Sequence, residues 1–373
     1  MIFFEFGPDD GPALFRNPAA LVTAHAAAEV SSAMDRLDAA RQAGKWIAGW
    51  ISYEAGYALE HRLLPLVPGS AGPLLSFGVF DAPDAADLPP AAGDVRLSPL
   101  RPMVSRGEYD TAFARAHDYI RAGDCYQVNL TFPLESRLDS GAPLDLYHAL
   151  RRLQPVGFGA YADLGGPVVV SRSPELFIRL DPSGLIETRP MKGTAPRDPD
   201  PRRDAELAQE LAASEKNRAE NLMIVDLLRN DIGRISRIGS VRVPELFAVE
   251  PFATVHQMSS RVTGQLAAPA SLAMLMRALF PCGSITGAPK IRAMQIIREI
   301  EPFPRGVYCG TLGWMAPDGS GCFSVAIRTL SVWPDRRITL NVGGGIVDDS
   351  TAGTEWEEAL WKTRFVLPLT TRG

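Results

Sequence analysis

The amino-acid sequence predicts an α+β protein, because stretches with strand character come in groups separated by helical stretches and do not alternate singly with helices. The chain has 373 residues, of which 46% are hydrophobic and 22% are charged, the ordinary proportions of a globular protein. This length suits one large domain or two closely joined ones. Disordered, collagen-like and coiled-coil architectures therefore fit the sequence poorly.

The net charge and the N-terminal sequence narrow the class of protein further. The formal net charge is −5, so no basic field favours nucleic acid or an anionic membrane. No apolar run approaches the roughly 18 residues of a membrane span, and Met1–Glu5 lacks the features of a signal peptide. Cysteines and histidines are scattered, without the spacing of a disulfide framework or a zinc site. We therefore expect a cytoplasmic protein without nucleic-acid or membrane partners.

The first hundred residues combine one helix with buried strands. A helical stretch is predicted over about residues 18–43, and strands are predicted over Trp46–Ile51 and Leu74–Phe80. Residues 81–102 are rich in Asp, Ala and Pro and have no hydrophobic period. Such a composition is typical of a surface connector.

A helix with a clear N-terminal signal follows this connector. Ser105 and Glu108 have the spacing of a capping box, and an amphipathic helix is expected to about Ala122. Residues 125–131 are then expected to form a strand. The turn Asp181–Gly184 indicates antiparallel pairing between the strands on either side of it. The short strands predicted in this part cover residues 157–164, 167–171, 175–180 and 185–189.

The second half of the chain is expected to contain four helices and three late strands. Thr354 is placed to cap the last of these helices. The predicted helices cover about residues 203–229, 271–280, 288–300 and 354–366. The predicted strands cover about residues 306–316, 322–333 and 338–342.

The densest polar segment is Thr188–Arg197, in which two prolines and a glycine indicate a rigid loop. Its structural interpretation is a surface loop with solvated cations. Its functional interpretation starts from Lys192, because lysine is scarce in this chain and Arg189 and Arg197 would add positive charge beside it. A neutral lysine amine is a competent nucleophile, so the functional interpretation is favoured.

Three glutamates stand beside apolar helical faces. Glu220 comes two residues before such a face, and Glu355 and Glu358 share one face of the last predicted helix, with Lys362 four residues after Glu358. The structural interpretation is a solvated rim and a surface ion pair worth about 0.3–0.5 kcal/mol. The functional interpretation is a set of oxygen ligands for a hard cation such as Mg²⁺. The pattern alone leaves both interpretations open.

Two glycine-rich stretches do not match nucleotide-binding motifs. Gly283–Lys290 lacks the G-K-[ST] ending of a P-loop, and Gly343–Gly345 is neither G-x-G-x-x-G nor the start of a helix. Each stretch is either a structural turn or a concave run of backbone N–H groups that binds a carboxylate.

Taken together, these segments resemble the chorismate-utilising enzymes, a family that includes anthranilate synthase component I, isochorismate and salicylate synthases, and aminodeoxychorismate synthase component I. The resemblance covers about residues 105–368, and a weaker one extends to Ser52–Tyr57. The motifs that carry it, in chain order, are Ala122–Leu130, Ser173–Phe177, Pro190–Thr194, Arg218–Asp231, Gly283–Lys290, Ile327–Thr329 and Gly343–Val347.

The resemblance implies a fold of two antiparallel β-sheets packed face to face with helices on the outside, as in anthranilate synthase component I. Within it, residues 1–100 would form an N-terminal α/β part of the sandwich. Residues 101–373 would form a chorismate-binding catalytic region. The two parts would pack intimately, as one domain or two.

Lys192 selects a branch within this family. Anthranilate and isochorismate synthases carry alanine at this position, whereas lysine is typical of the aminodeoxychorismate synthase component I branch, which residues 218–227 and 244–252 also resemble. The resemblance implies amination of chorismate at C4, through a covalent lysine adduct, to 4-amino-4-deoxychorismate on the route to 4-aminobenzoate and folate. The alternative is the anthranilate synthase component I reaction, which gives anthranilate plus pyruvate.

The resemblance also assigns roles to single residues. Lys192 would be the nucleophile and Glu175 the general acid and base. His256 matches a histidine near the departing C4 oxygen, and as a lone histidine it equally suits the core. The implied substrate-binding residues are Arg328, Tyr308, Gly344, Gly345, Thr194 and Lys362.

Mg²⁺ is the implied cofactor, held by Glu220 and Glu358 with Glu355 adjacent, directly or through water. Ammonia would come from a separate glutamine amidotransferase subunit, since no glutaminase domain is recognisable in the chain. Conversion of the product to 4-aminobenzoate would need a downstream aminodeoxychorismate lyase. A catalytically silent subunit with the same fold is a third hypothesis, which the chemically intact site positions disfavour.

Overall fold

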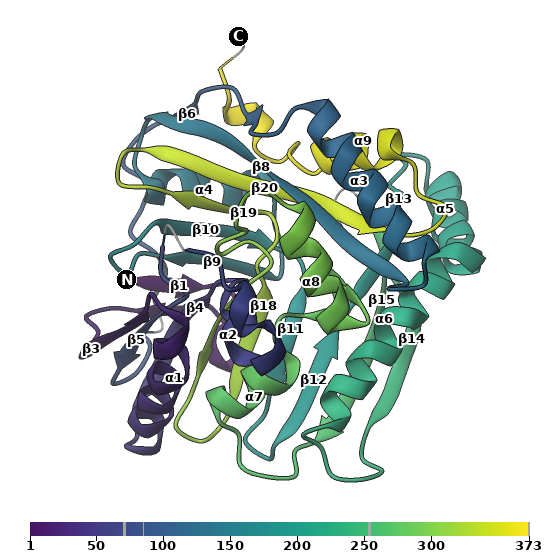
Figure 1. Ribbon diagram of the computed structural model, residues 1–373. Coiled ribbons are helices and arrows are strands. Elements are labelled where there is room, and N and C mark those ends of the chain that lie inside the picture. Colours follow the sequence, from purple (N-terminus) through teal and green to yellow (C-terminus); the bar gives the residue numbers. More distant parts are fainter. Residues whose placement is uncertain (70–71, 85, 253–254, 372–373) are drawn as a thin grey trace.

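The structure is a computed structural model that describes residues 1–69, 72–84, 86–252 and 255–371. Over these residues, two sheets of ten strands each lie face to face with helices on their outer sides (Figure 1). Every strand pair in both sheets is antiparallel. The predicted fold class is therefore confirmed. Among the described helices, none combines the length and apolarity that crossing a membrane requires.

The first sheet has the strand order β16-β8-β20-β19-β10-β9-β1-β2, with β6 and β7 also paired with β8. The long pair β8 and β20 sets Gly345 opposite Asn129. The strands of this sheet are β1 (Ile2–Phe4), β2 (Ala13–Phe15), β6 (Arg96–Leu97), β7 (Arg101–Pro102), β8 (Gln127–Ser140), β9 (Phe158–Ala162), β10 (Val168–Ser173), β16 (Gly287–Ala288), β19 (Thr329–Val332) and β20 (Arg337–Ile346).

The second sheet has the order β13-β15-β12-β11-β18-β17-β4-β5-β3, with β14 also paired with β15. Its strands are β3 (Ala20–Ala24), β4 (Trp46–Ile51), β5 (Leu75–Phe80), β11 (Leu176–Leu180), β12 (Leu185–Arg189), β13 (Met191–Pro196), β14 (Arg242–Pro251), β15 (Val255–Gln265), β17 (Thr311–Met315) and β18 (Gly321–Val325).

Strands from the N-terminal segment take part in both sheets. In the first sheet, β1 pairs with β9, so that Phe3 lies opposite Tyr161. In the second sheet, β4 pairs with β17, so that Gly49 lies opposite Gly313. Residues 1–80 therefore complete sheets whose other strands come from far along the chain.

Helices cover the outer faces of both sheets. In Figure 1, α3 and α9 lie over β8 and β20, while α5 and α6 lie beside β13, β14 and β15. The helices are α1 (Ala27–Gln42), α2 (Ala55–Leu59), α3 (Arg106–Arg121), α4 (Pro143–Leu153), α5 (Pro201–Ala213), α6 (Glu215–Gly233), α7 (Leu272–Leu279), α8 (Lys290–Ile300) and α9 (Ala352–Trp361). Four short 3₁₀ helices are also described: η1 (Pro8–Asp10), η2 (His61–Leu66), η3 (Gly283–Ile285) and η4 (Leu367–Leu369).

The alternation of side chains along each strand divides the core into two clusters. In β1, Phe3 contacts Tyr147 of α4 on the outer side, whereas Phe4 belongs to a cluster that draws residues from both sheets. This second cluster contains a chain of aromatic rings in contact with one another. We call five of these rings the inter-sheet aromatic cluster: Phe4, Phe6, Phe15, Trp46 and Trp314.

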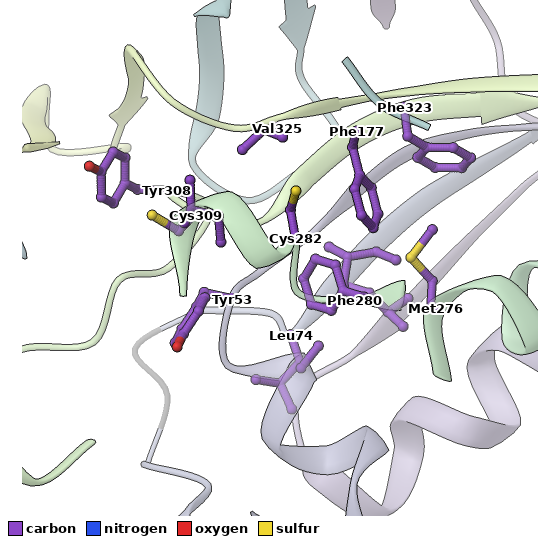
Figure 2. Close-up of a cluster of buried hydrophobic side chains, with 14 of the residues drawn as sticks. Tyr53, Leu74, Phe177, Met276, Phe280, Cys282, Tyr308, Cys309, Phe323 and Val325 are labelled. Atoms are coloured by element: carbon purple, nitrogen blue, oxygen red, sulfur yellow. The ribbon is translucent and has the colours of Figure 1, made fainter. Parts of the chain in front are cut away.

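The larger cluster continues beneath the loop that precedes α8. Figure 2 shows Phe177 and Phe280 facing each other. Cys282 lies between these two rings on one side and the neighbouring residues Tyr308 and Cys309 on the other. The rings of Phe177 and Phe280 meet edge to face with centroids 6.2 Å apart. Burial raises the pKa of Cys309 to about 12, so its thiol stays protonated at neutral pH.

Two of the predicted helices differ from the observed ones: one begins later in the chain, and the other is divided into two helices. The helix expected over residues 18–43 begins only at Ala27, because Ala20–Ala24 form β3. The helix expected over residues 203–229 is two helices, because Ser214 has a ψ of 110° and its hydroxyl caps α6 by accepting from Asn217 N. The last helix is capped by Thr351, not by Thr354.

Several predicted loops and strands are also corrected. Residues 322–333 form two strands, β18 and β19, that belong to different sheets. Most of the predicted loop Thr188–Arg197 is strand, in β12 and β13, and Gly343–Gly345 lies within β20. The helix α4 and the strands β14 and β15 were not predicted.

Candidate active site

The space between the two sheets changes character from one edge to the other. The inter-sheet aromatic cluster fills it near β1–β5, whereas polar side chains enter it near β13 and β20. Lys192 extends from β13 of one sheet, and Gly345 lies in β20 of the other. A Cβ atom on Gly345 would lie 3.0 Å from Lys192 Nζ, so the glycine lets the amine approach the facing strand closely.

Lys192 stands among carboxyl groups. Its Nζ lies 3.6 Å from Glu220 Oε2, with both side chains about one-fifth exposed. Glu220 comes from α6, which packs on β13 and β15. Glu175, Glu355 and Glu358 also interact electrostatically with Lys192. The structure thus brings the predicted nucleophile, the predicted general acid and the three predicted metal ligands to one site.

The arginines that flank Lys192 in the sequence are engaged elsewhere. Arg189 Nε lies 2.8 Å from Glu187, and Arg197 Nε lies 2.8 Å from Asp204. Each arginine is therefore paired with a carboxylate, although Glu187 also pairs with Arg261 and Asp204 with His256. The expectation that they add positive charge beside Lys192 is wrong, since the groups around its amine are mostly acidic.

Two glutamates approach Gly344 from α9. A Cβ atom on Gly344 would lie 3.0 Å from Glu355 Oε2 and 3.8 Å from Glu358 Oε1. Burial and the charge of Glu358 raise the pKa of Glu355, although Ser350 Oγ donates a hydrogen bond of 2.7 Å to it. Carboxylates that repel each other in this way favour a bound cation.

Lys362 joins this helix to β20. Its Nζ lies 2.8 Å from Glu358 and donates to Gly343 O at 2.7 Å. Desolvation acts to raise the pKa of Glu358, but the charge and hydrogen bond of Lys362 hold it below its ordinary value. The ion pair that the four-residue spacing predicted is thus confirmed.

Glu175 is buried at the start of β11. Burial raises its pKa to about 7, whereas a 2.7 Å hydrogen bond from Ser284 Oγ and the charges of Lys192 and Arg328 act in the opposite direction. A carboxyl group with a pKa near 7 can give or take a proton at neutral pH. The structure therefore gives Glu175 the property that its predicted role requires.

Arg328 lies between β18 and β19 with its backbone in the left-handed region, at a φ of 51°. Such a conformation costs a bulky residue about 1–3 kcal/mol and is common at functional sites. Burial lowers the pKa of Arg328, against the charge of Glu175. A partly buried guanidinium that forms no ion pair with a carboxylate of the described residues suits an anionic ligand.

Gln127 was part of a recognised motif but was not predicted as a site residue. It is fully buried, and among the described residues neither Nε2 nor Oε1 of its amide has a hydrogen-bond partner. The amide lies about 3 Å from the Cβ position of Gly345, on the side where Lys192 also approaches. Unpaired buried amides are costly, so this one is available to a ligand. The sequence carried no strong signal, because Gln127 is one of three polar residues, with Asn129 and Thr131, that alternate with apolar ones at the start of β8.

His256 and Thr194 make other contacts. His256 Nε2 lies 2.9 Å from Asp204 Oδ1, in a cluster that includes Arg197. Thr194 is exposed and donates to Gln257 Oε1 at 3.1 Å. No hydrogen bond or ion pair among the described residues joins either side chain to Lys192 or Glu175, so their roles stay predictions.

Tyr308 lies apart from the carboxylates around Lys192. It is 8% exposed, and burial raises its pKa well above its ordinary value. Its electrostatic partners are Cys309, Arg305 and Glu301. Its predicted contact with substrate therefore stays a prediction.

The described residues contain no group of three His, Cys, Asp or Glu side chains close enough together to hold a metal ion. The donor set nevertheless fits a hard cation, because Glu220, Glu355 and Glu358 offer only oxygen atoms. A cavity of about 530 Å³ between α2, α6, α7 and α8 contains none of the predicted site residues.

The sequence matches the family of chorismate binding enzymes over residues 4–368. Over 284 residues it is 47% identical to aminodeoxychorismate synthase component 1 of Klebsiella aerogenes, which covers 76% of this chain and 62% of that protein. Over 278 residues it is 42% identical to anthranilate synthase component 1 of Pseudomonas aeruginosa, which covers 74% of this chain and 56% of that protein. The matches thus span about three-fifths of the length of these curated relatives.

A solved structure agrees in fold. The anthranilate synthase component I of Streptococcus pneumoniae superposes with a TM-score of 0.81 at 26% identity, covering 95% of this chain and 91% of that one. The match to the family extends over nearly the whole chain and includes every residue of the site described above. The chain belongs to the chorismate binding enzyme family.

Proposed function

We propose that this protein aminates chorismate at C4 and so produces 4-amino-4-deoxychorismate for the synthesis of 4-aminobenzoate. The similarity to aminodeoxychorismate synthase component 1 supports the pathway. The observation that carries the proposal is the place of Lys192, whose amine reaches the space between Gly345 and Glu220. An alanine at this position would leave that space open.

The proposed reaction divides one difficult substitution into two. Lys192 loses a proton and bonds through nitrogen to C2 of chorismate. The ring double bonds shift, and the C4–oxygen bond breaks as Glu175 donates a proton, so that water leaves. Ammonia then bonds to C4 and gives up a proton. The double bonds return, and the bond between C2 and Lys192 breaks.

Charge complementarity supports the binding of a dicarboxylate at this site. Arg328 is the partly buried cation proposed for the pyruvyl carboxylate, with Gly344, Gly345 and Tyr308 as further predicted contacts. Lys362 partly offsets the glutamates of α9. The unpaired amide of Gln127 offers both a donor and an acceptor to the substrate or to ammonia.

Mg²⁺ is the proposed cofactor. Glu220 and Glu358 would hold it, with Glu355 adjacent, directly or through water. Bound there, it would supply positive charge that offsets these carboxylates and the ring carboxylate of chorismate. The mutual repulsion of Glu355 and Glu358 supports a cation at this place.

The proposal includes two partners. A separate glutamine amidotransferase subunit would supply ammonia, and the names of the curated relatives, as component 1, agree with a further component. A downstream aminodeoxychorismate lyase would convert the product into 4-aminobenzoate.

The second candidate is the anthranilate synthase component I reaction, which the 42% identical relative favours. It requires ammonia to reach C2, where Lys192 would stand in its way. A silent binding subunit is a third candidate. The raised pKa of Glu175, to about 7, argues against it, because a subunit that only binds its ligand does not require a carboxyl group that can transfer a proton at neutral pH.

A product assay tests the proposal. The purified chain is incubated with chorismate, Mg²⁺ and ammonium at mildly alkaline pH, and the products are separated by chromatography and identified by mass. We expect 4-amino-4-deoxychorismate with its enolpyruvyl group intact. Anthranilate plus pyruvate would overturn the proposal in favour of the second candidate. The partner is tested with glutamine as the only nitrogen source, where the chain alone should be inactive.

A further inference from the structure

Arg305 is an enclosed cation beneath the active site that the proposed chemistry does not use. Its side chain is 1% exposed. Nε and Nη2 donate to the two carboxylate oxygens of Glu301 at 2.9 and 2.7 Å. Its guanidinium carbon also lies 4.4 Å from the centre of the Tyr53 ring. A buried cation is tolerated only when it is paired and hydrogen-bonded in this way.

Two further hydrogen bonds lead from Arg305 to the walls of the active site. Nη1 donates to Ile285 O at 3.0 Å, and Nη2 donates to Asn129 O at 2.6 Å. Ile285 follows Ser284, whose hydroxyl donates to Glu175, and Asn129 lies opposite Gly345 in the sheet. Arg305 therefore ties the loop with Ser284 to the strand beside Gly345.

The loop with Ser284 depends on anchors outside itself. Its own backbone hydrogen bonds are long, since Ile285 N and Thr286 N reach carbonyl groups of Cys282 and Gly283 at 3.4 and 3.3 Å, and Thr286 Oγ1 adds a bond to Cys282 O at 3.1 Å. The shorter bonds come from outside. Asn129 N donates to Thr286 O at 2.8 Å, and Arg305 donates to Ile285 O at 3.0 Å.

A second carboxylate fixes the backbone of Arg305. Glu54 is buried, and its two oxygens accept from Arg305 N at 2.7 Å and from Gly306 N at 3.0 Å. Tyr53 N donates to Gly306 O at 2.8 Å. Tyr53 and Glu54 belong to Ser52–Tyr57, the N-terminal motif to which the proposed chemistry gives no role. Figure 2 shows Tyr53 in the core below Cys309.

We propose that Arg305 is a positioning residue that sets the hydrogen bond between Ser284 and Glu175. Glu54 holds its backbone for this purpose, and Glu301 holds its side chain. The inference rests on the proposed function in one respect, since it takes Glu175 as the proton donor. Arg305 is enclosed by protein groups and acts through Ser284.

The direction of the expected effect follows from the groups that face Glu175. Burial raises its pKa to about 7, and Ser284, Lys192 and Arg328 each act to lower it, with the thiol of Cys282 also nearby. Displacing Ser284 removes one of the lowering contributions. The pKa of Glu175 should therefore rise when Arg305 no longer holds the loop.

The test measures that pKa in the unliganded full chain by infrared difference spectroscopy against Glu175→Gln, which identifies the signal. Arg305→Lys keeps the charge but cannot reach all four acceptors. We expect the pKa of Glu175 to rise by about 0.5–1 unit in Arg305→Lys, as in Ser284→Ala. The double variant should match Ser284→Ala alone. In turnover of chorismate, the limb of the kcat/KM profile that belongs to Glu175 should move to higher pH by the same amount, about 0.5–1 unit, in Arg305→Lys, while KM stays within about twofold.

Arg41→Lys is the matched control. Arg41 is also buried, beside Asp38 and the carbonyl groups of Ala316 and Ala270, and makes no contact with the loop that carries Ser284. It should lower thermal stability without moving the pKa of Glu175. Should Arg305→Lys fail to fold, Glu54→Gln replaces it, because it leaves the guanidinium intact and puts an amide donor in place of one carboxylate oxygen that accepts from a backbone N–H group. We expect the same upward shift there.

The proposal is overturned if Ser284→Ala raises the pKa of Glu175 while Arg305→Lys and Glu54→Gln leave it unchanged. It is also overturned if Ser284→Ala has no effect, or if Arg41→Lys gives the same shift. The spectroscopic measurement needs no turnover. Formation of anthranilate by the unaltered chain would therefore contradict the proposed function without deciding the role of Arg305.

Discussion

The two ends of the space between the sheets differ in content although the same two sheets enclose both. At one end, Phe15 packs against Trp46 and Phe80, with ring centroids 6.2 and 5.2 Å apart. At the other end, Lys192 approaches Gly345 of the facing strand and lies among carboxyl groups, including those of Glu220 and Glu175. We expect the aromatic end to stabilise the pairing of the sheets. We expect the polar end to contribute less to stability, as is usual where a site carries chemistry.

The largest effect is expected from Lys192→Ala at the polar end. Loss of the nucleophile should lower C4 amination at least about 10³-fold and abolish any chorismate adduct in the mass spectrum of the intact protein. With the lysine gone, we expect some ammonia to attack C2 and give anthranilate. Lys45→Ala is the control, because Lys45 is exposed and pairs with Asp81 near the aromatic end. Unchanged amination in Lys192→Ala would refute the role of the nucleophile.

Trp314→Ala tests the aromatic end. Trp314 is 5% exposed, contacts Trp46 at 5.6 Å and donates from Nε1 to Phe6 O at 2.8 Å. Its removal should lower the free energy of unfolding by about 3–5 kcal/mol, measured in urea, while kcat of the folded fraction stays the same. Trp361→Ala, at an exposed tryptophan, should cost less than about 1 kcal/mol. If Trp314→Ala loses activity while its free energy of unfolding stays unchanged, the proposed difference between the two ends is wrong.

Glu175→Gln should lower kcat about 10²- to 10³-fold. The pH dependence gives a sharper test. Glu175 acts as an acid when protonated, so activity at a fixed concentration of free ammonia should fall as the pH rises through about 7 in the unliganded enzyme. The variant should lose that limb of the kcat/KM profile. Glu135→Gln, at a half-exposed glutamate of β8, should keep it. A limb that persists in Glu175→Gln belongs to another group.

The smallest effect is expected at the proposed metal site. Glu355→Gln should raise the Mg²⁺ concentration for half-maximal activity about tenfold, because one of the facing carboxylates is removed. Glu357→Gln lies on the same helix but is exposed, and it should leave that concentration unchanged. The measurement is a magnesium titration of turnover after treatment with a chelator. If Glu355→Gln and Glu357→Gln need the same Mg²⁺ concentration for half-maximal activity, Glu355 is not part of the metal site.

Local signals predicted the elements that local contacts stabilise. The helix after Ser105 has its capping box, with Glu108 N donating to Ser105 Oγ and Ser105 N donating to Glu108 Oε2. The strand Trp46–Ile51 is apolar and was predicted with the bounds that the structure gives it. By contrast, β15 escaped prediction, because it buries His256, Ser259 and Ser260 and so lacks an apolar alternation. Its polar residues belong to the site end of the sandwich.

The site residues were predicted by resemblance, and the structure adds the contacts that bring them together. Glu220 and Lys192 meet across two elements, and no spacing within either segment fixes that distance. Gln127 and Arg305 escaped prediction as functional residues for a related reason. Each is a buried polar residue whose partners, or whose lack of them, depend on segments distant in the sequence.

The pairing of β4 with β17 has a consequence for the synthesis of the protein on the ribosome. Residues 46–51 emerge early, but their partner strand at residues 311–315 emerges only when most of the chain has been made. At ordinary rates of translation the delay is on the order of tens of seconds. During that time one edge of β4 is open, with Trp50 and Ile51 exposed to the cell. We therefore expect the nascent chain to benefit from protection by a chaperone until its second half arrives, and truncated chains to aggregate.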